Sequence, residues 1–283
     1  MITGSSGLLG TELIKIASKD ESIEIVEFNS ISNPRSLCNV SDCFEALENI
    51  DGVIHLAAIM ENANMDFDQY YDVNVLGTKV LRQEALRRNI KPFIFISSIN
   101  VYDHSRMPYD GFKEESATNP LTNYSKSKLL AENELLYLDN KGLLILRVSN
   151  LIGNRLHPGS LFSGIIEEAI NKKIIYVYGK GNRLYDFVST KYVSKIILDG
   201  IRSQITGLYN VGCGLGTSVL WIAKEIKKLT SFEIIYINEN KEKIDAYMNC
   251  SKIELVTNIP RDKRRYIISN ILDQYNLLQE IKS

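Results

Sequence analysis

The chain has 283 residues, of which 45% are apolar and 24% charged, and its formal net charge is −1. This composition is typical of one large folded domain or two coupled ones, and it excludes a disordered or collagen-like chain. The balanced charge gives no overall attraction to nucleic acid or to an anionic membrane, so neither is expected as a partner. No apolar run reaches the roughly 20 residues of a membrane-spanning helix, and the first residues lack the pattern of a secretion signal. A cytoplasmic protein is therefore expected.

Expected strands and helices alternate along the first half of the chain. The strands are expected at Met1–Thr3, Glu24–Phe28, Gly52–Leu56, Pro92–Ser97 and Leu143–Val148. The helices are expected at Leu9–Ser18, Cys43–Asn49, Tyr71–Arg88 and Tyr124–Leu138. Strands and helices that alternate at this spacing indicate an α/β fold with a doubly wound parallel sheet. The first strand is unusually short for the central position that such a sheet gives it.

The alternation loosens after about residue 150. Short strands are expected at Ile174–Val177, Leu208–Val211 and Glu233–Ile237, with helices between them. We therefore expect two domains, a dinucleotide-binding domain at 1–150 and a smaller α/β substrate lobe at 151–283. The division leaves room for the chain to cross between the two lobes.

The cysteines and histidines are scattered along the chain. They are Cys38, Cys43, Cys213, Cys250, His55, His104 and His157. A zinc site needs several such ligands at short, regular spacings, so no metal is expected.

The segment Thr3–Gly10 reads TGSSGLLG, with glycines at three-residue intervals. Glycine permits a tight turn and lets the backbone approach a pyrophosphate, while the N-terminus of the following helix faces the anion. An ordinary glycine-rich turn is the alternative, because three glycines alone are a weak signal.

Further motifs follow in a fixed order. They are His55-Leu56-Ala57-Ala58, Asn74-Val75-Leu76-Gly77-Thr78, Phe95-Ile96-Ser97-Ser98-Ile99-Asn100-Val101-Tyr102, Asn123-Tyr124-Ser125-Lys126-Ser127-Lys128, Arg147-Val148-Ser149-Asn150, Tyr185-Asp186-Phe187-Val188 and Tyr209-Asn210-Val211-Gly212. With the glycine turn, they resemble the extended short-chain dehydrogenases/reductases, which include nucleotide-sugar epimerases, dehydratases and reductases. The resemblance covers Thr3 to about Pro260 and implies a Rossmann-like sheet, a nicotinamide cofactor, a nucleotide-sugar substrate and a homodimer.

Tyr124 and Lys128 are the candidates for proton transfer. Four residues apart, they share one face of the expected helix, and an ammonium beside a phenol lowers the pKa of the phenol. A tyrosine tuned in this way exchanges a proton with a sugar hydroxyl or carbonyl. Ser98 follows an apolar strand, where α/β folds collect their ligands, and the family pattern favours it over Ser97. The resemblance also implies a supporting role for Asn74.

The cofactor site implied by the resemblance is spread over the first domain. Its expected residues are Gly4, Ser6, Gly7, Leu8, Gly10, Asn29, Ser30, Arg35, Asn39, Val40, Leu56, Ala57, Ala58, Asn74, Ile96, Tyr124 and Lys128. Asn29 stands where NAD enzymes of this family usually carry an acid. Without that carboxylate a 2′-phosphate is not repelled, so NADP, contacted by Ser30 or Arg35, remains an alternative to the expected NAD.

The substrate is expected to contact Ser98, Asn100, Tyr124, Asn150 and Arg183. Ile99 and Asn100 occupy the positions after Ser98 where 4,6-dehydratases of the family carry acids, so dehydration is disfavoured. A nucleotide-sugar 4-epimerase is the first hypothesis, and an NADP-dependent keto-sugar reductase is the second. A non-catalytic dinucleotide sensor is the third, disfavoured because Ser98, Tyr124 and Lys128 are all present.

Overall fold

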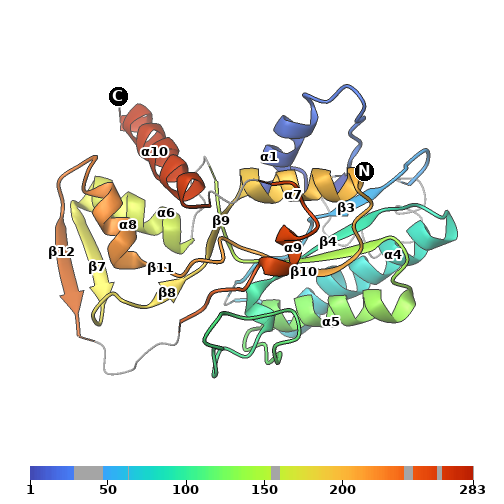
Figure 1. Ribbon diagram of the computed structural model, residues 1–283, viewed down its shortest axis with the longest axis horizontal. Coiled ribbons are helices and arrows are strands. Elements are labelled where there is room, and N and C mark those ends of the chain that lie inside the picture. Colours follow the sequence, from blue (N-terminus) through green and yellow to red (C-terminus); the bar gives the residue numbers. More distant parts are fainter. Residues whose placement is uncertain (29–46, 63, 154–159, 239–244, 260–262, 283) are drawn as a thin grey trace.

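The computed structural model describes residues 1–283 apart from 29–46, 63, 154–159, 239–244, 260–262 and 283 (Figure 1). Six strands form a parallel sheet in its larger part. They are β1 (Ile2–Thr3), β2 (Glu27–Phe28), β3 (Val53–His55), β4 (Phe93–Ser98), β5 (Leu143–Val148) and β10 (Gly207–Val211). Their order is β10-β5-β4-β3-β1-β2. The predicted doubly wound α/β sheet is confirmed, and its topological switch point lies between β1 and β3, where such sheets bind ligands.

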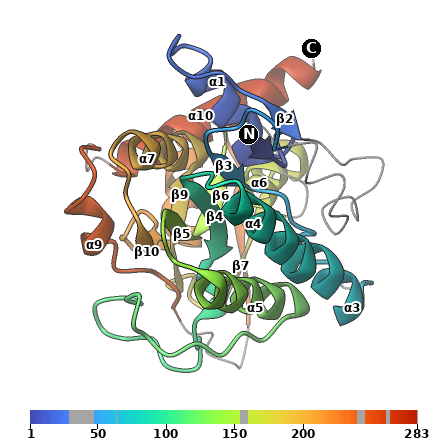
Figure 2. The ribbon, with the colours of Figure 1, turned by 90° about the vertical axis from the view of Figure 1, so that its right-hand side faces the viewer.

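Alternation along the strands divides the sheet into two apolar faces. In β4, Phe93 and Phe95 pack on one face with residues of α4 (Thr78–Arg87) and α5 (Asn123–Leu138). Ile94 and Ile96 pack on the other face, with residues of α1 (Leu8–Ala17) and α7 (Thr190–Arg202). Figures 1 and 2 show these helix pairs on opposite sides of the strands. Both faces are buried, which is why β4 and β5 read as continuous apolar runs in the sequence.

The helix expected at Tyr71–Arg88 is divided into three parts. It begins as α3 (Phe67–Tyr70), capped by Asp66, continues as a π-helical segment, η2 (Tyr71–Gly77), and ends as α4. Periodicity predicted one continuous helix, and it indicated neither the π-helical segment nor the earlier start at Phe67. π-helical turns are frequent at functional sites, and this one carries Asn74.

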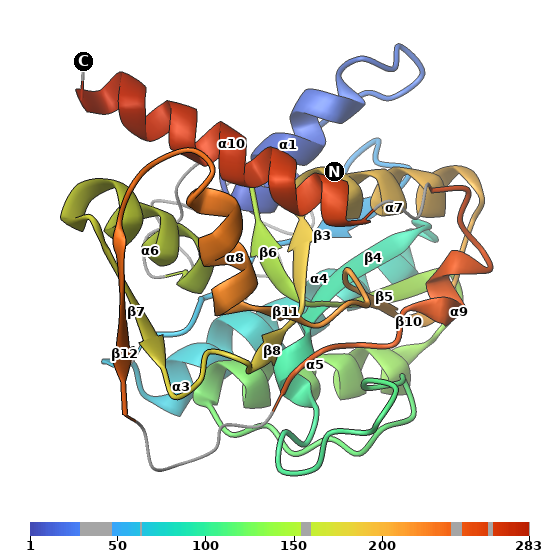
Figure 3. The ribbon, with the colours of Figure 1, turned by 60° about the vertical axis from the view of Figure 1, so that its left-hand side comes forward.

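The smaller lobe has a hydrophobic core of its own. Its elements are α6 (Leu161–Glu167), η4 (Glu168–Lys172), β7 (Ile174–Tyr178), β8 (Leu184–Tyr185), β11 (Thr217–Ser218), α8 (Val219–Ile226), β12 (Glu233–Ile237) and α10 (Lys263–Lys282). β7 pairs with β12 and β8 with β11, so the lobe is built on two small sheets beside the large one (Figure 3). Among the described residues its core shares no member with the two cores of the large sheet.

The chain crosses between the two lobes more than once. β6 (Asn150–Ile152) and β9 (Phe187–Ser189) pair at the junction. The strand expected at Leu208–Val211 is β10, which pairs in parallel with β5 at the edge of the large sheet and so does not belong to the smaller lobe. Two short helices, η3 (Ile99–Val101) and α9 (Ser251–Glu254), complete the description. No helix in the described part of the chain is long and apolar enough to cross a membrane.

Candidate functional site

The glycine turn packs tightly against the end of β3. Gly4 has φ +69°, and a Cβ on it would lie 2.7 Å from the backbone nitrogen of Ala57. A Cβ on Gly10 would lie 2.5 Å from the carbonyl oxygen of Gly4, whereas one on Gly7 would meet only that oxygen, at 3.2 Å. Gly4 and Gly10 are therefore required by the fold, while exposed Gly7, the N-cap of α1, is the glycine that a bound group can approach.

The end of β3 lies beside this turn, as the sequence predicts. The backbone N–H of Ala57 donates to Thr3 Oγ1 at 3.2 Å, and that of Leu56 donates to the Thr3 carbonyl oxygen at 3.2 Å. Leu56, Ala57 and Ala58 are half-buried. The two expected parts of the cofactor site thus share one edge of the sheet.

Ser98 ends β4 and is the N-cap of η3. Its Oγ accepts the backbone N–H of Asn100 at 3.2 Å, while the Asn100 side chain is exposed. Ile96, one strand alternation earlier, is buried. The site is therefore at the carboxyl end of a central strand, in agreement with the position expected for Ser98.

Tyr124 lies in the first turn of α5, which contacts both β4 and η3. The hydroxyl of Thr122 caps this helix by accepting the backbone N–H of Ser125 at 3.2 Å. Burial, reinforced by the negative charge of Glu61, raises the pKa of the Tyr124 phenol above its ordinary value of 10. The lowered phenol pKa expected from the sequence is therefore wrong for this structure, because loss of water around the phenolate is the largest effect.

Lys128 is the perturbed base of the site. Its side chain is buried, and Nζ lies 4.3 Å from the centre of the Phe95 ring. Burial lowers the Lys128 pKa to about 7, although the negative charge of Glu132 opposes the shift. A buried lysine whose pKa is lowered to about 7, on a helix packed against a central strand, is typical of a functional site.

Asn74 is held by both ends of its amide. Its Oδ1 accepts the backbone N–H of Ile59 at 2.8 Å, and its Nδ2 donates to the Ile59 carbonyl oxygen at 3.0 Å and to Ser127 Oγ at 2.9 Å. Ser127 precedes Lys128 in α5, and its hydroxyl donates to the Tyr124 carbonyl oxygen at 2.7 Å. η2 thus connects the end of β3 with the helix that carries Tyr124 and Lys128.

The sequence analysis missed an ion pair that anchors α5 to the sheet. Arg147 on β5 donates to Glu132 with Nε at 3.0 Å and Nη2 at 2.6 Å, and both side chains are buried. The signal was present, because Glu132 lies four residues after Lys128 on the face of α5 that includes Tyr124. Arg147, which the sequence analysis named only as part of a motif, binds within the fold.

The candidates for substrate contact lie around the lobe junction. Asn150 is exposed and donates to the Asp186 carbonyl oxygen from its backbone nitrogen at 3.2 Å and from Nδ2 at 2.8 Å. Half-buried Arg183 stacks on Tyr185, with its guanidinium carbon 4.6 Å from the ring centre.

Asp186, whose carbonyl oxygen accepts both hydrogen bonds from Asn150, has a structural role that the sequence analysis did not single out. Its carboxylate accepts the backbone N–H groups of Cys213 at 2.7 Å and Met248 at 3.1 Å, and the hydroxyl of Ser149 at 3.2 Å. Burial nevertheless raises its pKa to about 6. Asp186 ties together segments that leave and enter the large sheet.

Several expected site residues lie outside the described part of the chain. They are Asn29, Ser30, Arg35, Asn39 and Val40 of the cofactor site. Within the described residues no group of three or more His, Cys, Asp or Glu side chains is placed to hold a metal ion.

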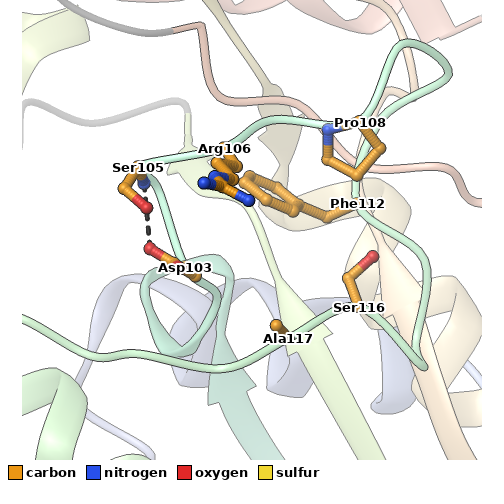
Figure 4. Close-up of a pocket in the computed structure, with 7 residues that line it drawn as sticks. All are labelled: Asp103, Ser105, Arg106, Pro108, Phe112, Ser116 and Ala117. Atoms are coloured by element: carbon orange, nitrogen blue, oxygen red, sulfur yellow. Dashed lines mark hydrogen bonds between the residues drawn. The ribbon is translucent and has the colours of Figure 1, made fainter.

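A separate pocket of about 570 Å³ lies in the loops between η3 and α5 (Figure 4). Its lining residues are Asp103, Ser105, Arg106, Pro108, Phe112, Ser116 and Ala117. None of them was expected in the site, and Phe112 stacks on Tyr102 at its base, with ring centres 4.9 Å apart.

Residues 1–212 match the family model described as "NAD dependent epimerase/dehydratase family". The chain belongs to this family. It is 25% identical over 282 residues to a UDP-glucose 4-epimerase of Yersinia enterocolitica, covering 83% of each chain. It is 28% identical over 267 residues to a dTDP-D-glucose 4,6-dehydratase of Dictyostelium discoideum, covering 80% of this chain and 61% of that relative.

The fold is similar to that of a solved UDP-glucuronic acid 4-epimerase from Bacillus cereus in complex with NAD. The TM-score is 0.81 at 20% identity, covering 100% of this chain and 99% of the other. The expected family and its Rossmann-like fold are thereby confirmed. Because both epimerases and dehydratases are among the relatives, family membership leaves the reaction open.

Proposed function

We propose that this protein is an NAD-dependent nucleotide-sugar epimerase that inverts C4 of the sugar through Ser98, Tyr124 and Lys128. The observation that carries the proposal is the placement of buried Lys128, with its pKa of about 7, one helical turn from Tyr124 on a helix that contacts the strand ending at Ser98. A proposed proton-transfer group and an adjustable positive charge then lie on the helix packed against β4, whose carboxyl end is where ligands of such sheets bind.

The residues at the glycine turn fit a dinucleotide. Gly7 is exposed at the N-terminus of α1, so a pyrophosphate can approach the backbone there, and a side chain would occupy its space. The glycine turn at the N-terminus of α1 would hold NAD, which would supply a reversible hydride acceptor for the sugar carbon. The NAD-bound relative of Bacillus cereus supports this choice of cofactor.

Tyr124 is proposed to move the proton of the sugar hydroxyl. With its pKa raised by burial, the phenol carries a proton at neutral pH and donates it to a keto oxygen. To take the proton of the sugar hydroxyl in the oxidation step, the phenol must first release its own proton to solvent, and protonated Lys128 supplies the positive charge that stabilises the phenolate. Ser98 is proposed to donate a hydrogen bond to the same sugar oxygen, and Asn74 to hold α5 in place.

The nucleotide diphosphate is proposed to lie toward the smaller lobe, against Arg183, Asn150 and Asn100. The guanidinium of Arg183 is a suitable partner for phosphate oxygens. The neutral residues Ile99 and Asn100, which follow Ser98, supply no acid for the loss of water, so epimerisation is favoured over 4,6-dehydration although dehydratases are among the relatives.

An NADP-dependent keto-sugar reductase is the second candidate. It is favoured by Asn29, which is uncharged and stands where the NAD-dependent extended short-chain dehydrogenases/reductases usually carry an acid.

The test begins with the nucleotide released from freshly purified, denatured protein. We expect NAD, and we expect the intact protein to convert UDP-glucose, UDP-N-acetylglucosamine or UDP-glucuronic acid to its C4 epimer without added cofactor. Consumption of a keto-sugar that depends on added NADPH would establish the reductase instead. Release of a 4-keto-6-deoxy sugar would show a dehydratase and contradict both candidates.

A further inference from the structure

A row of buried polar side chains runs from the glycine turn to the helix that carries Tyr124. Thr3 Oγ1 lies 2.7 Å from His55 Nδ1, and His55 Nε2 lies 2.8 Å from Thr78 Oγ1. The hydroxyl of Thr78 donates to the carbonyl oxygen of Asn74 at 2.7 Å, and Asn74 Nδ2 donates to Ser127 Oγ at 2.9 Å. All five side chains are at most 1% exposed, so water does not compete for these contacts.

The chemistry of the partners fixes the direction of each hydrogen bond. Thr78 has one hydroxyl proton, and a carbonyl oxygen only accepts, so this proton goes to Asn74 and Thr78 Oγ1 must accept from His55 Nε2. Burial and the nearby charge of Lys128 lower the His55 pKa to about 3, so the imidazole is neutral and its Nδ1 carries no proton. His55 Nδ1 therefore accepts the hydroxyl proton of Thr3.

The register of the sheet explains how the row arises. Thr3 on β1 is paired with His55 on β3, and His55 with Phe95 on β4, so the three side chains lie side by side on one face of the sheet. The His55 and Phe95 rings are stacked, with centres 5.8 Å apart, and Lys128 lies over Phe95. The row thus runs under the helices that carry the proposed site.

We propose that His55 and Thr78 are positioning residues that hold the cofactor turn and the proton-transfer helix in one fixed relation. The proposal rests on the proposed function. At one end, the Thr3 hydroxyl holds both His55 and the N–H of Ala57, next to Gly4. At the other end, the amide of Asn74 holds Ser127, whose hydroxyl holds the Tyr124 carbonyl. A neutral imidazole suits the middle, because it accepts at one side of a rigid ring and donates at the other.

The decisive variants change Thr78 without changing its volume. Thr78→Val removes the hydroxyl, so His55 Nε2–H and the Asn74 carbonyl both lose a partner. We expect kcat to fall by about 10- to 100-fold, the effect of a small misplacement of reacting groups, with the KM for the sugar changed less than about twofold. Thr78→Ser restores the hydroxyl and is expected to restore kcat. A large KM increase, or equal kcat in the Val and Ser variants, would overturn the proposal.

The matched control is Ser194→Ala on α7. Its hydroxyl is also fully buried, has no hydrogen-bond partner among the described residues, and lies on the opposite face of the sheet. We expect parental kcat and KM from this variant. A loss of kcat equal to that of Thr78→Val would show that any buried hydroxyl matters and would remove the special role of Thr78.

The two ends of the row are tested together by combining Thr3→Val with Thr78→Val. If the two hydroxyls act through His55, the change in kcat at saturating cofactor will depart by more than about twofold from the product of the single changes. If the kcat change of the double variant equals the product of the two single changes, Thr3 and Thr78 do not act through His55 and the proposal is overturned.

A spectroscopic measurement tests the hydrogen bonds of His55 to Thr3 and Thr78 without any assay of the reaction. The result therefore does not depend on whether the proposed reaction is correct. The chain has three histidines, so the imidazole nitrogens of the ¹⁵N-histidine-labelled protein are assigned by comparison with His55→Gln. We expect a protonated Nε2 and an unprotonated Nδ1 for His55 near pH 7. The opposite tautomer, or a protonated ring, would overturn the row of hydrogen bonds even if the protein proves to be an epimerase.

Discussion

The large sheet and the smaller lobe differ in how deeply some of their candidate functional residues are buried. On the sheet, Asn74 and Lys128 are almost completely buried and held by specific partners. In the lobe and at its junction, Asn150 is exposed and Arg183 is half-buried. Rigid placement suits the transfer of a proton, whereas exposed side chains adapt to the shape of a substrate. The predictions below test this division, from the largest expected effect to the smallest.

The largest effect is expected from Tyr124→Phe. The ring is kept but the only group proposed to move the proton is lost, so the turnover rate should fall by about 10²–10⁴-fold, while the dissociation constants of cofactor and sugar change little. Tyr137→Phe, on the same helix but 86% exposed, is the control and should retain the parental rate. Near-normal turnover of Tyr124→Phe, measured by product formation, would end the proposed mechanism.

Lys128→Met is expected to change how stability depends on pH. Lys128 has a pKa of about 7 in the folded protein against 10.5 in the unfolded chain, so between these values the unfolded chain binds more protons and stability rises with pH. The cost of burying the charge, on the order of 5 kcal/mol, is present below pH 7 and absent above pH 10.5.

The methionine variant should therefore be more stable than the parent near pH 6, with the difference shrinking steadily toward about pH 9.5. Urea unfolding without added nucleotide measures it. A stability difference between variant and parent that is independent of pH would show that the Lys128 pKa is not lowered by burial. The contrast in burial between the sheet and the lobe would then be lost for this residue.

A methyl group added at Gly10 should lower the stability of the fold, whereas one added at Gly7 should weaken cofactor binding. In Gly10→Ala the Cβ meets the Gly4 and Ser5 backbone at 2.5 and 2.6 Å, so the free energy of unfolding should fall by about 1–3 kcal/mol. In Gly7→Ala the fold should be nearly unchanged, and a similar free energy should instead be lost from cofactor binding, about 10- to 100-fold in affinity. Chemical unfolding and calorimetric NAD titration separate the two. Unchanged NAD affinity in folded Gly7→Ala would remove the turn from the cofactor site.

The smallest effect is expected in the lobe. Arg183→Ala should raise the KM for the nucleotide sugar by about tenfold, since one charge-assisted hydrogen bond to phosphate is lost, and should leave NAD affinity unchanged. Lys180→Ala removes a cation three residues away on an exposed side chain and should change neither. Equal effects of the two variants on KM would show a general effect of charge and would remove Arg183 from the site.

The sequence predicted the large sheet well because its strands are buried on both faces. Leu143–Val148 was predicted with the bounds observed, and Phe93–Ser98 differs by one residue at each end. Glu24–Phe28 shortened to Glu27–Phe28, since strand propensity alone does not show where pairing with β1 begins. Local patterns also could not show that β10 returns to the large sheet, because a pairing with β5 across about 60 residues leaves no trace in either segment.

Motif spacing singled out Ser98, Tyr124 and Lys128, and their roles stay predictions. The structure places Ser98 at the end of β4 and the other two on α5. The direction of the Tyr124 pKa shift was wrong because burial, which depends on the packed structure, raises the pKa, and the negative charge of Glu61 raises it further. His55 and Thr78 were visible only as members of motifs, and their contact joins side chains 23 positions apart.

The separate hydrophobic cores bear on how such a protein changes during evolution. A substitution in the core of the smaller lobe, at Phe162 or Ile222 for example, has no direct neighbour among the described residues of the two sheet cores. Under the proposed function, substitutions confined to the lobe would alter recognition of the sugar and leave the packing of the cofactor-binding sheet intact. Directed evolution toward new substrates should therefore use libraries confined to the lobe. Asp186 should be kept unchanged in them, because its carboxylate accepts the backbone N–H groups of Cys213 and Met248 at the junction.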